Sequence, residues 1–175
     1  MRVLLVINSK TGFTKKYADW ISEEITCSVQ SYQDFLRTPT DADMVIFGSR
    51  VHAGRIEYLN KIKPRFKNDP TRQLIIFATG ATPASVENVI EKIWAENLTD
   101  AEIKSIPHFY MQSGLNYEKM GFLDRTIMKV VSRLLGSKTV KNDEESGFEQ
   151  AIRASHDISS KEYIKPLVRY VRARK

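Results

Sequence analysis

Small hydroxyl-bearing residues and one glycine fill the segment from Asn8 to Thr14, which directly follows a run of branched apolar residues. Ser9, Thr11 and Thr14 carry hydroxyl groups that can donate hydrogen bonds to an anion, and Gly12 lets the backbone approach a ligand closely. Successive backbone N–H groups at the start of a helix favour a phosphate group. The alternative is that Thr14 only caps a helix and Gly12 only makes a turn. The residues alone leave both interpretations open.

Other phosphate-binding motifs do not fit this loop. It lacks the G-x-x-x-x-G-K-[ST] spacing of a P-loop and the G-x-G-x-x-G spacing of a dinucleotide-binding fold. A phosphate-accepting response regulator would need acidic residues at the ends of its first and third strands, which here read Asn8-Ser9 and Gly48-Ser49-Arg50. The loop therefore belongs to a different class of phosphate site or to none.

Strand-like and helix-like patterns alternate around this loop. Continuous apolar runs, typical of strands buried on both faces of a parallel sheet, occur at Val3–Ile7, Met44–Phe47 and Leu74–Ala78. Helical periodicity follows each run, from Thr14 to Ile25, around Tyr58 to Phe66 and around Ala84 to Ala95. We also expect an edge strand at Ser28–Tyr32 and a fifth strand at Phe109–Gln112. The alternation predicts one α/β domain, residues 1–175, built on a doubly wound parallel sheet.

The late part of the chain departs from this alternation. Apolar residues recur at helical spacing between Met120 and Leu135, beside a basic stripe formed by Arg125, Lys129 and Arg133. We interpret about 117–140 as a helical insertion. Further helices are expected near Gly147 and over 161–175. The insert's apolar stripe packs on the domain in one interpretation and presents an interaction surface in the other.

The segment Ser9 to Thr14 resembles the [ST]-x-T-G-x-T loop with which flavodoxins hold the phosphate of FMN. Two further segments fall where the flavin-contacting loops of that family lie, each after a predicted strand. The resemblance implies a five-stranded sheet in the order 2-1-3-4-5, with bound FMN at the carboxyl ends of the strands. The residues that it places on FMN are Ser9, Lys10, Thr11, Gly12, Phe13, Thr14, Ser49, Arg50, Val51, His52, Ala53, Gly54, Thr79, Gly80, Ala81 and Thr82.

The insert is similar to that of the flavodoxin-type protoporphyrinogen oxidases, through Ser113–Tyr117 and Gly121–Lys129. This resemblance implies that FMN takes electrons from protoporphyrinogen, in heme biosynthesis, and passes them to a membrane quinone. Phe122, with the basic stripe Arg125, Lys129 and Arg133, would then form a substrate or membrane surface. We expect the substrate to be a porphyrinogen or a quinone, with no side chain acting as an obligatory catalytic group.

The segments Ser49–Arg55 and Thr79–Thr82 contain no aromatic ring besides the imidazole of His52, whereas flavodoxins usually cover both faces of the flavin ring with aromatic residues. An open face would suit a planar substrate. The alternative is that Tyr58, Tyr117 or another distant aromatic residue folds over the flavin. Arg50, His52 and Arg55 are interpreted as a cationic cluster for the reduced flavin or for substrate carboxylates, or else as ordinary exposed loop charges.

Composition sets the remaining expectations. The 175 residues include 27 Lys and Arg and 21 Asp and Glu, for a net charge of +6, and 42% of them are hydrophobic, which excludes a disordered or collagen-like chain. The positive charge argues against an acidic, diffusible flavodoxin that carries electrons between proteins, which is the second hypothesis; a non-catalytic flavin-binding module is the third. We expect a cytoplasmic protein with peripheral contact to anionic membrane, no nucleic-acid partner and no metal. The lone Cys27 cannot form an internal disulfide.

Overall fold

The computed structural model describes residues 1–67, 69, 71–116, 118–119 and 155–174, and structural statements below refer to these residues. The chain divides into two compact units. Unit 1 combines Met1–Ser113 with Ser159–Lys175, and unit 2 is Gly114–Ile158. Every residue that we placed on FMN lies in unit 1.

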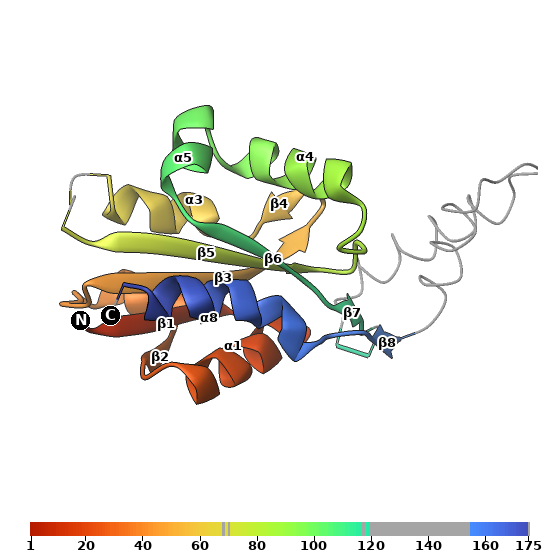
Figure 1. Ribbon diagram of the computed structural model, residues 1–175, viewed down its shortest axis with the longest axis horizontal. Helices are drawn as coiled ribbons and strands as arrows, with labels where there is room; N and C mark the ends of the chain where they lie inside the picture. The colour runs from red at the N-terminus through yellow and green to blue at the C-terminus, as the bar shows by residue number, and fades with distance from the viewer. Residues whose placement is uncertain (68, 70, 117, 120–154, 175) are drawn as a thin grey trace, which may run out of the picture. The chain divides into compact units, whose positions relative to one another are not determined.

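A parallel sheet forms the centre of unit 1 (Figure 1). Its strands run in the order β2-β1-β3-β5-β6, which is 2-1-3-4-5 when the parallel strands are counted along the chain, so the predicted order is confirmed. The register places Leu5 beside Val29 on one side and beside Ile46 on the other. The bounds are β1 (Val3–Asn8), β2 (Ser28–Ser31), β3 (Met44–His52), β5 (Gln73–Gly80) and β6 (His108–Gln112).

Burial explains why these segments became strands. β1, β3 and β5 lie inside the sheet and are buried along nearly their whole length, as their continuous apolar runs require. β2 is an edge strand of four half-buried or exposed residues, and Val29 is 51% exposed. The sequence predicted this difference between central and edge strands from the apolar content of each run.

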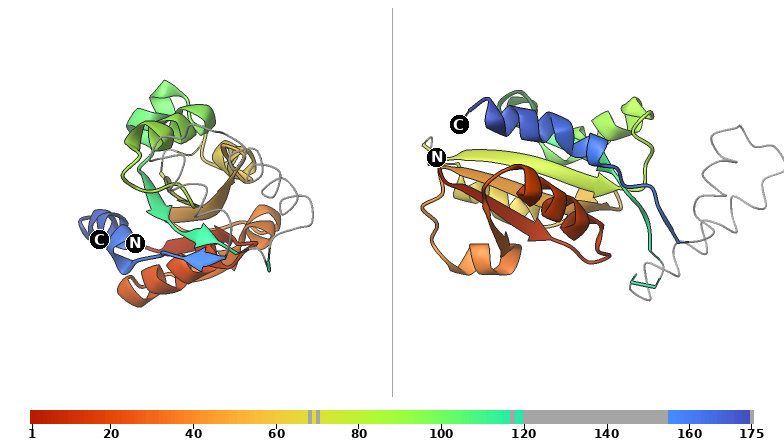
Figure 2. Two further views of the ribbon diagram at one scale, coloured as in Figure 1. Left: turned by 90° about the vertical axis from the view of Figure 1, so that its right-hand side faces the viewer. Right: turned by 60° about the horizontal axis from the view of Figure 1, so that its bottom comes forward.

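Two helical layers cover the sheet (Figures 1 and 2). On one face, α1 (Phe13–Glu24) and α8 (Lys165–Arg172) enclose a core that includes Tyr17, Ile21 and Leu167. The second core lies on the other face and includes Phe35, Ile62 and Trp94. Its helices are α2 (Tyr32–Arg37), α3 (Leu59–Ile62), α4 (Glu87–Asn97) and α5 (Asp100–Ser105), and short 3-10 turns follow α3 at Lys63–Arg65 and precede α8 at Lys161–Ile164.

One extension of the sheet departs from the sequence-based expectation. β3 was expected to end at Phe47, but it continues to His52 and then turns back through β4 (Arg55–Ile56), which pairs with it in an antiparallel hairpin. The added pairing keeps the end of β3 extended although its residues are polar. Ser49–His52, which we expected to be loop, is therefore strand.

Unit 2 contributes a short antiparallel pair, β7 (Gly114–Leu115) with β8 (His156–Asp157). Gly114 is required there because a Cβ atom would lie 1.9 Å from the carbonyl oxygen of His156. The predicted insert helix, with Phe122, Arg125, Lys129 and Arg133, and the helix expected near Gly147 lie outside the described residues.

Candidate flavin-binding site

The predicted phosphate loop connects β1 to α1. Gly12 is the N-cap of α1 and has a left-handed backbone, with φ of 98°, a conformation that favours glycine. No side chain caps the helix at this residue, and its first turn contains no acidic residue. The hydroxyl of Ser9 accepts a hydrogen bond from the Lys15 N–H at 3.1 Å. The loop therefore combines a helix N-terminus, hydroxyl groups and a glycine, and these features fit a phosphate dianion.

Thr14 lies inside α1 and is not its N-cap, so the interpretation of Thr14 as a helix cap is wrong. Its side chain is 98% buried, and its hydroxyl oxygen lies 2.9 Å from that of Thr79 at the end of β5. This contact joins the first predicted FMN loop to the third. The structure thus brings together two segments that are 65 residues apart in the sequence.

The second predicted FMN segment is the end of the β3–β4 hairpin. Ser49 is fully buried and Arg50 nearly so, whereas His52 and Ala53 are exposed at the turn. Ala53 and Gly54 both have a positive φ, 49° and 77°, as a two-residue hairpin turn of the type I′ class requires. The turn is thus the exposed part of this segment, and the predicted contacts of the whole segment with FMN stay a prediction.

A buried polar network fixes the strand ends at this point. The guanidinium of Arg50 donates to both carboxylate oxygens of Glu57, at 2.9 and 2.7 Å. The Asn8 amide donates to Glu57 at 3.1 Å and to the Ser49 hydroxyl at 3.0 Å. Burial alone would raise the pKa of the Glu57 carboxyl, but the hydrogen bonds from Arg50 and Asn8 outweigh that effect and hold the pKa below its usual value.

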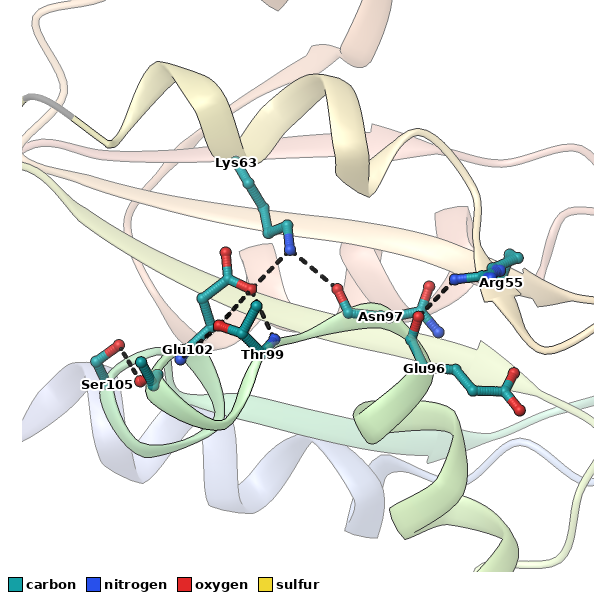
Figure 3. Close-up of polar contacts among 8 residues, drawn as sticks. Arg55, Lys63, Glu96, Asn97, Thr99, Glu102 and Ser105 are labelled. Carbon is teal, nitrogen blue, oxygen red and sulfur yellow. Dashed lines mark hydrogen bonds and ion pairs between the residues drawn. The ribbon is translucent and has the colours of Figure 1, made fainter.

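The three cations that we grouped beside the flavin do not share one environment. Arg50 is held by Glu57, and Nδ1 of His52 lies 3.9 Å from the same carboxylate. Arg55 instead donates to the carbonyl oxygen of Glu96 at the end of α4 (Figure 3). Arg50 and His52 thus lie beside one carboxylate, whereas Arg55 reaches α4, and the role of these three residues toward the flavin stays a prediction.

The third predicted segment, Thr79–Thr82, consists of the last two residues of β5, which pair with β6, and the two residues that follow them. Gly80 packs against Tyr110, whose hydroxyl oxygen would lie 2.6 Å from a Cβ atom at this position. The same hydroxyl donates to the carbonyl oxygen of Thr82 at 3.0 Å. Burial raises the pKa of the Tyr110 hydroxyl to about 12, so that it remains a donor.

The three segments meet at the carboxyl ends of neighbouring strands. Asn8 pairs in register with Ser49, and Arg50 with Thr79. This edge of an open α/β sheet, at the point between β1 and β3 where the strand order reverses, is where such folds bind ligands. Glu57, Tyr110, Asn97 and Gln112 also support the site and were not predicted, since no sequence pattern links them to the loops.

Tyr58, one aromatic residue considered as a cover for the flavin, packs against a second aromatic ring. Its ring stacks on that of Tyr32, with centroids 4.1 Å apart and an angle of 20° between the planes. Tyr117, the other candidate, lies outside the described residues. The hairpin turn and the third segment include four small residues, Ala53, Gly54, Gly80 and Ala81, beside Val51, His52, Thr79 and Thr82.

Other kinds of site were also considered. Within the described part of the chain, no three His, Cys, Asp or Glu side chains are grouped so that they could hold a metal ion. None of the described helices has the length and apolar character needed to cross a bilayer. The ring of His108 lies against Trp94 and its Nδ1 contacts the Ile106 carbonyl oxygen, which is a structural environment.

Comparison with known proteins places the chain in a family. The model of the flavodoxin domain matches residues 4–142, and the chain belongs to this family. No significant match was found among curated protein sequences. Family membership also supports the predicted cofactor, FMN.

Several solved structures are similar to the chain at low identity. A flavodoxin, WrbA-like protein from Agrobacterium tumefaciens is 15% identical, with 71% of this chain and 87% of that one covered and a TM-score of 0.39. A flavoprotein in complex with FMN from Lactobacillus acidophilus is 15% identical, with 63% and 91% covered and a TM-score of 0.44. The Trp repressor binding protein from Bacillus subtilis is 9% identical, with 86% and 95% covered and a TM-score of 0.41. These likenesses are remote, and the family assignment rests on the sequence match.

Proposed function

We propose that this protein is an FMN-dependent oxidoreductase that dehydrogenates a porphyrinogen-like substrate or acts as a quinone-linked dehydrogenase. The observation that carries the proposal is the small-residue rim of the site. Tyr58 is stacked on Tyr32, and the loops that would face the flavin ring offer Ala53, Gly54, Gly80 and Ala81. A ring bordered by such residues leaves a face on which a planar substrate can stack.

Each part of the site has a role in this proposal. The N-terminus of α1, with the hydroxyls of Ser9, Thr11 and Thr14, binds the phosphate of FMN and orients the cofactor. The turn at Val51–Gly54 and the segment Thr79–Thr82 border the ring. FMN itself supplies the transfer of electrons when bound. The exposed His52 is placed to contact a carboxylate of the substrate, whereas Arg50, paired with Glu57, keeps the end of β3 in place.

An absorption spectrum and an anaerobic titration test the redox proposal. We expect the purified protein to show bound-flavin bands with added FMN, these bands to bleach when protoporphyrinogen is added without oxygen, and the bands to return when a quinone is then added. Flavin bands that resist protoporphyrinogen would contradict the oxidoreductase and favour an electron carrier. A protein that binds no FMN would contradict the site.

A pair of variants tests the phosphate loop. Gly12→Asp places a carboxylate beside the phosphate, whereas Gly12→Asn has nearly the same size and tolerates the same left-handed backbone. We expect the Asp variant to lose FMN affinity by at least about tenfold through charge repulsion, and to bind riboflavin, which has no phosphate, as the Asn variant does. Equal FMN affinities of the two variants would contradict a phosphate site at this loop.

We also propose that the insert gives the protein peripheral contact with anionic membrane at the inner face of the cytoplasmic membrane. The support is in the sequence, where Phe122 accompanies the basic stripe of Arg125, Lys129 and Arg133. Each cation near an anionic surface contributes about 1 kcal/mol. Sedimentation with anionic vesicles should remove the protein from solution at low salt, and reversal of the three charges should abolish this binding. The same binding by the charge-reversed chain would contradict this surface.

A further inference from the structure

The turn of the β3–β4 hairpin is held by one amide side chain, that of Asn97 at the end of α4. Its oxygen accepts the N–H of Ile56 at 2.8 Å, and its nitrogen donates to the carbonyl oxygen of Gly54 at 2.7 Å. The nitrogen also donates to the Ile93 carbonyl oxygen, at 2.7 Å, one turn back in α4. The amide therefore pairs with one backbone N–H and one carbonyl oxygen of the hairpin, as a neighbouring strand would.

The surroundings of Asn97 are themselves anchored (Figure 3). Nζ of Lys63 donates to the backbone carbonyl oxygen of Asn97 at 3.0 Å and to the Glu102 carboxylate at 2.7 Å. A Cβ atom on Gly54 would lie 2.6 Å from a carboxylate oxygen of Glu96, so the hairpin turn comes close to the last turn of α4. The hairpin is thus fixed to α4 and not left as a free loop.

A second amide side chain, that of Gln112 in β6, holds the segment after β5 in a similar way. Its oxygen accepts the N–H of Ala84 at 2.9 Å and the hydroxyl of Tyr163 at 2.9 Å. Tyr110, two residues earlier, donates to the Thr82 carbonyl oxygen. The N–H of Ser113 donates to the Gly80 carbonyl oxygen at 2.8 Å. β6 therefore supports this segment along its length.

We propose that Asn97 and Gln112 are positioning residues that preform the two ring-bordering segments, Val51–Gly54 and Thr79–Thr82, for the flavin. The inference rests on the proposed FMN site and extends it to residues outside the loops. Segments that are already ordered do not lose conformational freedom when the ring binds, so the affinity for the ring is higher. Because Asn97 holds the hairpin turn at Gly54 and Gln112 holds Ala84, just after Thr79–Thr82, the loss of either side chain should act on the ring and not on the phosphate loop.

Riboflavin provides the test, since it has the ring of FMN without the phosphate. We expect Asn97→Ala and Gln112→Leu each to weaken riboflavin binding by about tenfold or more, the effect of leaving partly buried backbone groups unpaired. Gln112→Glu keeps an oxygen that accepts both hydrogen bonds and should retain the wild-type affinity for riboflavin. Asn97→Asp keeps the acceptor for Ile56 but loses both donors, and it should bind as weakly as Asn97→Ala.

Two control variants separate positioning from a loss of stability. Thr71→Ala removes a hydroxyl hydrogen bond to the Asp69 carboxylate, and Gln73→Leu removes an amide hydrogen bond to the Tyr170 hydroxyl at the opposite end of β5. Both lose side-chain hydrogen bonds without touching the ring-bordering segments or the Asn97 network, and both should keep the wild-type affinity for riboflavin. The midpoint potential of FMN, measured at saturation, should shift in Asn97→Ala and Gln112→Leu but not in the controls.

The outcomes are distinct. If the wild-type protein binds neither FMN nor riboflavin, the flavin site is wrong and the positioning role falls with it. If the wild type binds both but the Asn97 and Gln112 variants behave like the controls, the positioning role is overturned and the proposed function stands. Should Asn97→Ala fail to fold, Gln112→Leu and Gln112→Glu decide the question on their own.

Discussion

At the scale of single residues, Ala53 is held in a backbone conformation that alanine seldom adopts. Its φ of 49° belongs to the left-handed region, and the two central residues of such a turn are usually Asn-Gly and not Ala-Gly. We predict that Ala53→Gly raises the free energy of unfolding by about 0.5–1 kcal/mol, because glycine relieves the steric cost at Cβ. Urea unfolding measures the change.

A control for this prediction is a glycine at a helical alanine. Ala95 lies on the exposed side of α4, and Ala95→Gly should lower the free energy of unfolding by about 1 kcal/mol. The two substitutions are chemically identical and should have opposite signs. Destabilisation by both would show that the strain at Ala53 is unimportant to stability.

Glu57 makes the stability of the protein sensitive to acid. Its pKa is lowered in the folded state, so the charged carboxylate stabilises the fold above the unfolded-state pKa, and this contribution is lost as the pH falls through the folded-state value. We predict that Glu57→Gln is less stable than the wild type at pH 7 and that the difference shrinks from about pH 5 downward. Urea unfolding across this pH range, with Glu91→Gln on α4 as a control for net charge, measures the effect. A difference that is the same at pH 7 and pH 3 would contradict the assignment.

At the scale of elements, the Phe77 ring of β5 lies against Gly48 of β3, which has no side chain. Gly48 and Phe77 are register partners, and a Cβ atom on Gly48 would lie 2.0 Å from the Phe77 ring. We predict that Gly48→Ala lowers the free energy of unfolding by about 2 kcal/mol or more, since the ring is fully buried and has no space to move. Urea unfolding measures this loss in the free energy of unfolding. In the background of Phe77→Leu the same substitution should cost much less, and equal costs in the two backgrounds would contradict a local clash.

The sequence predicted the regular elements well and the short ones poorly. A continuous apolar run such as Val3–Ile7 identifies a central strand, because only a strand buried on both faces needs it. The helices α2 and α5 have six residues each, too few for an apolar period to show. Their capping residues, Ser31 with Asp34 and Thr99 with Glu102, were the available signal.

The residues of the candidate site also differ in how well the sequence predicts them. The phosphate loop was predictable because its residues are adjacent in the sequence and serve one local purpose. The partners Glu57, Asn97 and Gln112 were not, because each acts by reaching a backbone or side chain that only the folded sheet brings near. The extension of β3 was missed for a related reason, since Arg50 is tolerated in a buried strand only through its pairing with Glu57.

At the scale of the whole molecule, both hydrophobic cores consist of residues from unit 1 alone. Neither core includes a described residue of unit 2. The two segments of unit 1 that flank unit 2 end at Ser113 and begin at Ser159. Both segments bind the same atom, the hydroxyl oxygen of Tyr17. The Tyr17 hydroxyl donates to the Gln112 carbonyl oxygen and accepts the Ser160 N–H at 3.2 Å. Unit 1 therefore has its own hydrophobic core, and the two points where unit 2 joins it lie close together. Both features are typical of a domain that carries an inserted segment.

This arrangement predicts that unit 1 folds and binds flavin without the insert. A chain in which 114–158 is replaced by a short Gly-Ser linker should unfold cooperatively in urea and bind FMN with an affinity near that of the full chain, because the joined ends already lie together at Tyr17 and a short loop costs little to close. The same chain should no longer bind anionic vesicles or oxidise a porphyrinogen, if the insert carries those surfaces. Cooperative unfolding is measured by circular dichroism and FMN binding by fluorescence titration. A deletion chain that aggregates, or that folds but binds no FMN when the full chain does, would show that unit 2 completes the domain, and the inserted-segment view would then be wrong.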